Sequence, residues 1–246
     1  MEFSEYELDC LIYRPGPIYL SKKDLSGANL RGANLARADL RGAYLKGAFL
    51  IGAILICADL GDAFLEDAEL SGASLRGANI YGVDWTRANL MGTNMRYAPL
   101  QGANLRGVKL IESNLEGANL EAACMENTLL WCANLKGANL TGANLNGSNL
   151  EGANLTNALL EGACLRNSEL TGAKLDHARL IRADLTGANL EGVSLRNTDL
   201  SDAILNGANL EGVEYYQDNE WNGTIWPDGF DPLAAGAIKL VGCNPI

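Results

Sequence analysis

A five-residue period runs through most of this chain and restricts its fold more than any other feature. From Leu25 to Tyr215 an apolar residue occupies every fifth position without an insertion, which gives 39 consecutive repeats. A small residue, usually Ala, stands two positions before most of them, and Gly stands two positions after in 22 repeats. The typical unit reads Ala-Asn-Leu-x-Gly, as in residues 138–142. The apolar positions are nearly all Leu, with the exceptions Ile80, Trp85, Met95, Met125 and Tyr215.

This period fits a short strand followed by a turn. It matches neither the roughly 3.6 residues of a helical turn nor the two-residue alternation of a long strand. A Gly in most repeats also opposes a helix, at about 1 kcal/mol each relative to Ala. In Ala-Asn-Leu the first and third side chains share one face of a strand, and the next two residues turn the chain with the positive φ that Gly or Asn tolerates. The sequence therefore predicts a β-solenoid.

The repeats resemble the pentapeptide-repeat family, whose consensus is A(D/N)LXX, over residues 25–215. This resemblance implies an all-β fold, a right-handed quadrilateral parallel β-helix with four five-residue repeats per coil and therefore nearly ten coils. The segment Trp-Pro-Asp-Gly-Phe-Asp-Pro at 226–232 is similar to tails that follow the repeats in cyanobacterial members.

The two ends of such a rod are open sheet edges that need small terminal caps. We expect residues 1–24 to form the N-terminal cap, with a short helix because Ser4 and Glu7 have capping-box spacing and Pro15 follows the apolar stretch. Residues 216–246 are expected to form the C-terminal capping tail. Its side chains available to cover the last coil are Trp221, Trp226, Pro227 and Phe230.

Two positions depart from the repeat. Trp85 replaces an inward Leu, so its ring requires a local adjustment of the coil. Pro99 lies at the centre of a strand and has no N–H for the ladder, so we expect a local bulge or a lost hydrogen bond there.

The net charge of −11 is confined to the second half of the chain. Residues 1–110 carry 12 acidic and 12 basic side chains, whereas residues 111–246 carry 18 acidic and 7 basic ones. Direct binding of nucleic acid through a basic face is therefore disfavoured.

The sequence gives few indications of cellular location or of catalytic chemistry. No run approaches the roughly 20 apolar residues of a membrane span, and six cysteines without paired spacing suggest a reducing, cytoplasmic setting. The single histidine, His177, stands at a turn position, and no serine has a histidine to activate it. The sequence predicts no enzyme activity, no catalytic residue, no metal and no cofactor.

Residues that point outward from the coil are the remaining candidates for a function. If positions 20 apart stack, one column is apolar in its middle and acidic at its end, and this is the first candidate partner surface. Its members are Met91, Ile111, Trp131, with Leu129 beside them, then Glu151, Glu191 and Glu211. A second candidate cluster lies around one early coil and comprises Tyr44, Phe49, Ile51, Ile54, Ile56 and Phe64. Either group could instead pack on itself or on a cap, and residues 1–24 would more readily cover the second.

Two functions are compatible with this surface. The first is a non-enzymatic scaffold or regulator that binds an unidentified protein partner, as a monomer or a weak homodimer. The second follows from the resemblance, because some pentapeptide-repeat proteins mimic DNA and inhibit or protect DNA gyrase. The acidic second half suits DNA mimicry, whereas the neutral first half and the Pro- and Gly-containing tail do not.

Overall fold

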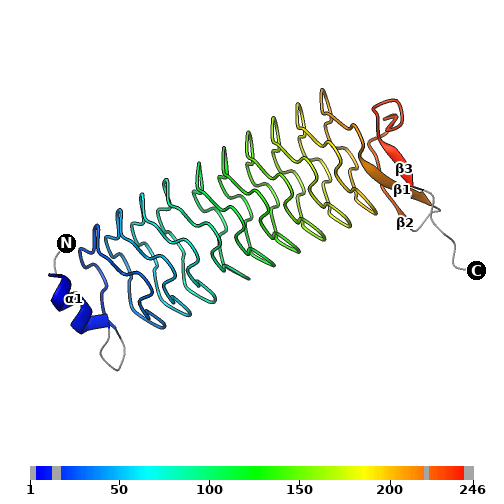
Figure 1. The fold of residues 1–246 in the computed structure, drawn as a ribbon. Helices are drawn as coiled ribbons and strands as arrows, with labels where there is room; N and C mark the ends of the chain where they lie inside the picture. Colours follow the sequence, from blue (N-terminus) through cyan, green and yellow to red (C-terminus); the bar gives the residue numbers. More distant parts are fainter. Residues whose placement is uncertain (1–3, 13–17, 219–221, 241–246) are drawn as a thin grey trace, which may run out of the picture.

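The computed structural model describes residues 4–12, 18–218 and 222–240 and shows an elongated coil of short parallel strands (Figure 1). Nearly every strand segment pairs in parallel with the segment 20 residues later, from Tyr19 with Asp39 to Ser194 with Glu214. Four repeats therefore complete one coil. We number the four faces of the rod by their central strand residues: face 1 starts at residue 19, face 2 at 24, face 3 at 29 and face 4 at 34, and each continues every twentieth residue.

The core is a stack of leucines and alanines. Leu140 and Ala143 are fully buried, as are their counterparts in nearly every coil. Burying one Leu side chain stabilises the fold by about 1.5–3 kcal/mol, so the stack is the main source of stability. Serine and threonine replace the inward Ala at some positions because the hydroxyl finds a carbonyl within the wall. Ser148, for example, donates to the carbonyl of Leu145 at 2.7 Å.

Backbone and side-chain hydrogen bonds explain the consensus. In the repeat around Leu140, the Gly142 amide donates to the Glu161 carbonyl in the next coil at 2.9 Å. The Thr141 amide donates to Asn139 Oδ1 at 3.1 Å, which closes the turn after the strand. Gly142 has a φ of +65°, and Arg37 adopts +59° at the same position of another repeat, so Gly is favoured there but not required.

The N-terminal residues form helix α1, Glu5–Ile12. The capping box is present, because the Ser4 amide donates to Glu7 Oε2 at 2.9 Å and the Glu7 amide donates to Ser4 Oγ at 3.3 Å. Leu8 and Ile12 are buried and belong to the same core as the coils. Pro15 lies outside the described residues. The repeated conformation begins inside the segment predicted as a cap, since Tyr19 pairs with Asp39 and Leu20 is buried.

At the C-terminal end, the last coil continues into strand β1, Glu214–Asp218. Strand β2, Asn222–Gly223, pairs with β1 antiparallel, and strand β3, Ile238–Leu240, pairs with β1 in parallel (Figure 1). Trp226 meets the ring of buried Tyr215 edge-on at 5.4 Å, and Phe230 stacks on Trp226 at 5.4 Å. Trp221 lies outside the described residues.

The ladder between coils is interrupted beside Trp85 and Pro99. Trp85 is completely buried at its inward position. Among the described residues, no bridge joins Asn79 to Pro99 or Asp84 to Asn104, although the same columns pair on both sides of the gap. The loss expected at Pro99 is confirmed, and it extends to the neighbouring face that leads to Trp85.

Candidate protein-binding surface

The central apolar group of the first candidate surface is contiguous. Leu129 is the central residue of face 3, and Met91, Ile111 and Trp131 occupy the first corner position after that face in three successive coils. Met91 is 42% exposed and Trp131 44%, so part of the Met91 thioether and part of the Trp131 ring can contact a partner. We refer to Met91, Ile111, Leu129 and Trp131 as the apolar stripe. The structure brings together the residues that the 20-residue register predicted as neighbours.

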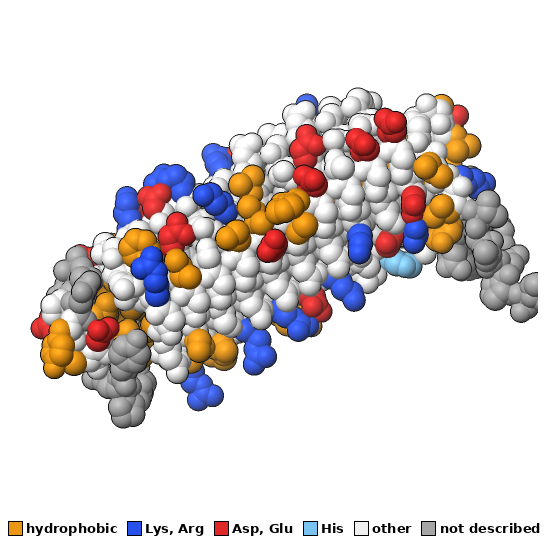
Figure 2. Space-filling model, viewed as in Figure 1, with side chains coloured by type: hydrophobic (Ala, Val, Ile, Leu, Met, Phe, Trp, Pro, Cys, Tyr) orange, Lys and Arg blue, Asp and Glu red, His pale blue; other side chains and the backbone are white. Residues whose placement is uncertain are grey.

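The same corner becomes acidic toward the C-terminus. Glu151, Glu191 and Glu211 are exposed, and none of them forms an ion pair with a described residue. The backbone amide of each donates to the Asn side chain two residues earlier, as Glu151 does to Asn149 Oδ1 at 2.9 Å. Turn formation therefore uses the backbone and leaves these carboxylates free. Figure 2 shows apolar side chains grouped near the middle of one side of the rod and acidic side chains beyond them.

The second candidate cluster does not form one surface. Tyr44 and Phe64 stack on face 2, with ring centroids 5.0 Å apart. Phe49 lies on face 3, where the guanidinium of Arg31 sits 4.5 Å from its ring centroid, and Ile51 occupies the adjoining corner. Ile54 and Ile56 lie on face 4 and the corner after it.

The members of this group lie around one coil but on different sides of it, because each repeat turns the chain by a quarter of a coil. Residues close in sequence therefore point in different directions. The expected cover is also missing among the described residues: Tyr44 is 48% exposed and Ile54 40%, and α1 packs on the end of the core instead. Phe49 and Ile51 share their side of the rod with the apolar stripe, which a reading by columns reveals.

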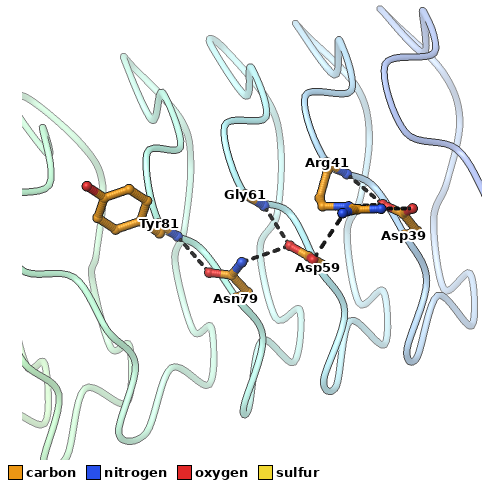
Figure 3. A network of polar contacts seen from close by, with 6 residues as sticks. All are labelled: Asp39, Arg41, Asp59, Gly61, Asn79 and Tyr81. Atoms are coloured by element: carbon orange, nitrogen blue, oxygen red, sulfur yellow. Dashed lines mark hydrogen bonds and ion pairs between the residues drawn. The ribbon is translucent and has the colours of Figure 1, made fainter.

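Other parts of the outer surface carry polar side chains that pair with one another. On face 1, Arg41 binds Asp39 through two hydrogen bonds of 2.9 and 2.8 Å and lies 3.7 Å from Asp59 (Figure 3). Asn79 donates to Asp59 Oδ1 at 2.8 Å, which extends the ladder to a third coil. The Arg41 hydrogen bond holds the pKa of Asp39 below its ordinary value. Exposed pairs of this kind contribute only about 0–1 kcal/mol each.

The groups considered for catalysis remain separate. His177 is exposed at a turn with a φ of +60°. The cysteines of the described part of the chain are free thiols, and Cys243 lies outside it. Within residues 4–12, 18–218 and 222–240, no three His, Cys, Asp or Glu side chains gather closely enough to hold a metal ion. No helix in those ranges has the length and apolar character needed to cross a bilayer.

The sequence did not predict one group of residues that the structure brings together. Asp62, Tyr81, Asp84 and Gln101 line a cleft where the coil ladder is broken. The available signal was the combination of Trp85 with Pro99 in adjacent coils, which together mark a weak point in the wall.

Several known proteins are similar to this chain. Similar solved structures include HetL, a pentapeptide repeat protein involved in heterocyst differentiation regulation from the cyanobacterium Nostoc sp. strain PCC 7120, at 32% identity. The match covers 94% of this chain and 99% of HetL, with a TM-score of 0.41. The pentapeptide repeat protein alr5209 from the same Nostoc strain is 38% identical over 44% of this chain and 82% of its own, with a TM-score of 0.29.

A plasmid-mediated fluoroquinolone resistance protein, QnrB1, is 20% identical over 68% of this chain and 83% of its own, with a TM-score of 0.41. No curated protein is similar enough in sequence to count as a relative. The family model described as pentapeptide repeats matches this chain, and the matched ranges are residues 19–47, 33–72, 68–107, 98–130, 133–172 and 173–212. The chain therefore belongs to the pentapeptide-repeat family.

Proposed function

We propose that this protein is a non-enzymatic scaffold that binds a protein partner through the apolar stripe and the acidic corner that follows it. The observation that carries this proposal is the grouping of Met91, Ile111, Leu129 and Trp131 at adjoining positions of successive coils, next to an acidic corner. Aromatic and Met side chains are enriched at the centres of protein interfaces, where they supply most of the binding energy.

The adjoining carboxylates would set orientation and specificity. Glu151, Glu191 and Glu211 extend the surface along the rod without ion pairs to described residues. A partner with an apolar patch beside a row of basic residues is complementary to this arrangement, and such charge complementarity mainly raises the association rate and rejects wrong partners.

The experiment compares the wild type with Trp131→Glu in a quantitative pull-down from an extract of the source cells. A charge at the centre of the stripe is expected to reduce recovery of the specific partner by at least about tenfold. Tyr19→Glu is the matched control, because Tyr19 is 65% exposed on face 1, away from the stripe. Equal recovery by wild type and Trp131→Glu, with circular dichroism showing both folded, would remove the stripe as the binding surface.

DNA mimicry is a second candidate, supported by the 18 acidic and 7 basic residues of 111–246. Part of that charge is already neutralised within the rod, since Glu116 pairs with Arg96 at 3.0 Å and Glu161 with Arg179 at 3.0 Å. We therefore place it second. A DNA gyrase supercoiling assay separates the two, because a mimic must inhibit or protect the enzyme at micromolar concentration and a scaffold for another partner must not.

We also propose that both terminal segments cap the rod and that the protein works in the cytoplasm. Burial of Leu8 and Ile12 at one end and the aromatic group on Tyr215 at the other support the first point. Free thiols at Cys57 and Cys132, both exposed, support a reducing compartment.

A further inference from the structure

The coil wall opens on faces 1 and 2 between residues 77–87 and residues 96–106. In the regular ladder, one amide in each strand and one in each turn donate to the next coil. These bonds are absent at the amides of Gly77, Ile80, Gly82, Trp85 and Arg87, all of them within the described residues 18–218. The carbonyls that should accept them belong to Arg96, Pro99, Gln101, Asn104 and Arg106.

One coil later the same bonds are intact. Leu100 donates to the Asn119 carbonyl at 2.7 Å, and Gly102 donates to the Glu121 carbonyl at 2.8 Å. The opening does not extend to face 3, because the Leu90 amide there still donates to the Lys109 carbonyl at 2.8 Å. The gap is therefore a one-sided slot between two coils, and it is not an end of the rod.

Two residues account for the slot. Pro99 has no N–H to offer the Ala78 carbonyl, so the pairing of that strand is lost. Trp85 carries the largest side chain of the core, fully buried where most repeats have Leu. Its ring needs more room than Leu at the face next to Pro99, and separating the coils on this side provides that room.

The slot is a real cleft of about 600 Å³. Ala103 lines it and is partly exposed, whereas its counterparts in the next two coils, Ala123 and Ala143, are buried. The volume falls within the roughly 300–1,000 Å³ of ordinary ligand sites. The lining residues are Asp62, Ile80, Tyr81, Gly82, Val83, Asp84, Pro99, Gln101, Gly102, Ala103 and Asn104.

The cleft is acidic, with two carboxylates and no Lys or Arg among its lining residues. Asp62 lies against the turn at Gly82, where an added Cβ would collide with its Oδ1. Burial raises the pKa of Asp84, but hydrogen bonds from the Thr86 hydroxyl and amide outweigh it and hold the pKa below its ordinary value. Two carboxylates without a basic residue in the lining favour a cationic group in the cleft.

The polar ladder of face 1 ends at this cleft. It runs from Asp39 through Asp59 to Asn79, whose Oδ1 accepts a hydrogen bond from the Tyr81 amide at 3.2 Å (Figure 3). The next residue in the column is Pro99, which offers no amide. Tyr81 itself is 65% exposed and stands at the edge of the cleft.

We propose that this cleft binds an extended, Lys- or Arg-containing peptide segment of a partner protein, inserted as an additional strand between the two coils. One wall presents a row of unpaired amides and the other a row of unpaired carbonyls. Most of these groups belong to exposed residues and are therefore open to a partner, and an extended chain can pair with both rows at once. Strand addition is an established way for proteins to bind peptides through the main chain, with pockets for alternate side chains.

In this arrangement basic side chains on one side of the inserted strand face Asp62 and Asp84. The site lies on faces 1 and 2, so it is distinct from the apolar stripe and does not depend on the function proposed above. Trp131→Glu serves as a control that leaves the cleft intact.

The test uses a fluorescein-labelled peptide of about ten residues that alternates Val and Lys, a length that matches a typical strand. Binding to the full chain is followed by fluorescence anisotropy and by amide hydrogen exchange. The lysine peptide is expected to bind and to slow exchange of the Ile80, Gly82 and Trp85 amides by at least about tenfold. A peptide with Glu in place of Lys should bind at least about tenfold more weakly, and a peptide N-methylated at alternate residues should not bind, because it cannot pair with both walls.

Two variants complete the test. Trp85→Leu combined with Pro99→Asn restores the consensus and should close the slot and abolish binding, whereas Trp131→Glu should bind like the wild type. Asp62→Asn combined with Asp84→Asn keeps the turns and should remove the preference for Lys over Glu. Unchanged exchange of the three amides at saturating peptide, or equal binding by the closed variant, would overturn the proposal.

Discussion

The coils around residues 137–167 and those around residues 77–107 have the same five-residue register but differ in continuity. In the first region Gly142 donates to Glu161 and Leu145 donates to Cys164 at 2.9 and 2.7 Å. In the second, the corresponding amides of Gly82 and Trp85 find no backbone acceptor among the described residues. An unbroken repeat in sequence therefore does not ensure an unbroken wall: the size of each inward side chain and the presence of each strand amide decide it.

The largest expected effect comes from damaging the regular region. Leu140→Ala removes a fully buried side chain between intact coils and should lower the free energy of unfolding by about 2–5 kcal/mol. Guanidinium chloride unfolding measures it, with Lys136→Ala as an exposed control from the preceding repeat, expected to stay within about 0.5 kcal/mol of wild type. Matching midpoints for wild type and Leu140→Ala would mean that this stack tolerates cavities.

The opposite effect is expected where the wall is already open. Trp85→Leu combined with Pro99→Asn should add several inter-coil hydrogen bonds, each contributing about 0.5–1.5 kcal/mol net. Loss of the buried Trp ring offsets part of this, so we expect a gain of about 1–3 kcal/mol in the free energy of unfolding. Amide exchange at Ile80 and Gly82 should slow to the rates of Leu100 and Gly102, one coil later.

The two single variants separate the causes of the slot. If Pro99→Asn alone restores slow exchange, the missing amide is sufficient to open the wall. If only Trp85→Leu does so, the ring volume is responsible. Exchange that stays fast even in the double variant would show that neither residue explains the opening.

Sequence predicted the fold well because the repeat encodes it locally. The inward Leu, the Asn or Asp that closes many of the turns and the positive φ after it all act within a few residues, and the contact at 20 residues follows from repetition. The capping box at Ser4 and Glu7 was equally local, and it is present.

Surface organisation was harder to predict because it depends on which corner each residue occupies. The column through Met91, Ile111 and Trp131 could be traced once the coil length was known. The group from Tyr44 to Phe64 rested on closeness in sequence, so it combined residues that lie on three different faces. The cleft was missed because Pro99 and Trp85 each predicted a small local defect, and only their combination opens two faces.

The smallest expected effect concerns the turn that both regions share. Many repeats close it with an Asn, such as Asn139, whereas the first repeat uses Asp24, whose Oδ1 accepts a hydrogen bond from the Ser26 amide at 2.9 Å. Chiefly through hydrogen bonds from the Ser26 amide and hydroxyl, the pKa of Asp24 is lowered from 3.8 to about 2. A carboxyl whose pKa is depressed by folding contributes stability above pH 3.8, and that contribution is lost as the pH falls through about 2.

Asp24→Asn preserves the turn but has no carboxyl to titrate in this range. We therefore expect the wild type to lose slightly more stability than Asp24→Asn between about pH 4 and pH 2, with the two alike near neutral pH. Urea unfolding at each pH measures the difference. The reciprocal change, Asn154→Asp, should introduce the same acid sensitivity into the regular region, because Thr156 offers an equivalent amide at 3.1 Å. A pH profile unaltered by either substitution would show that the turn does not distinguish carboxylate from amide.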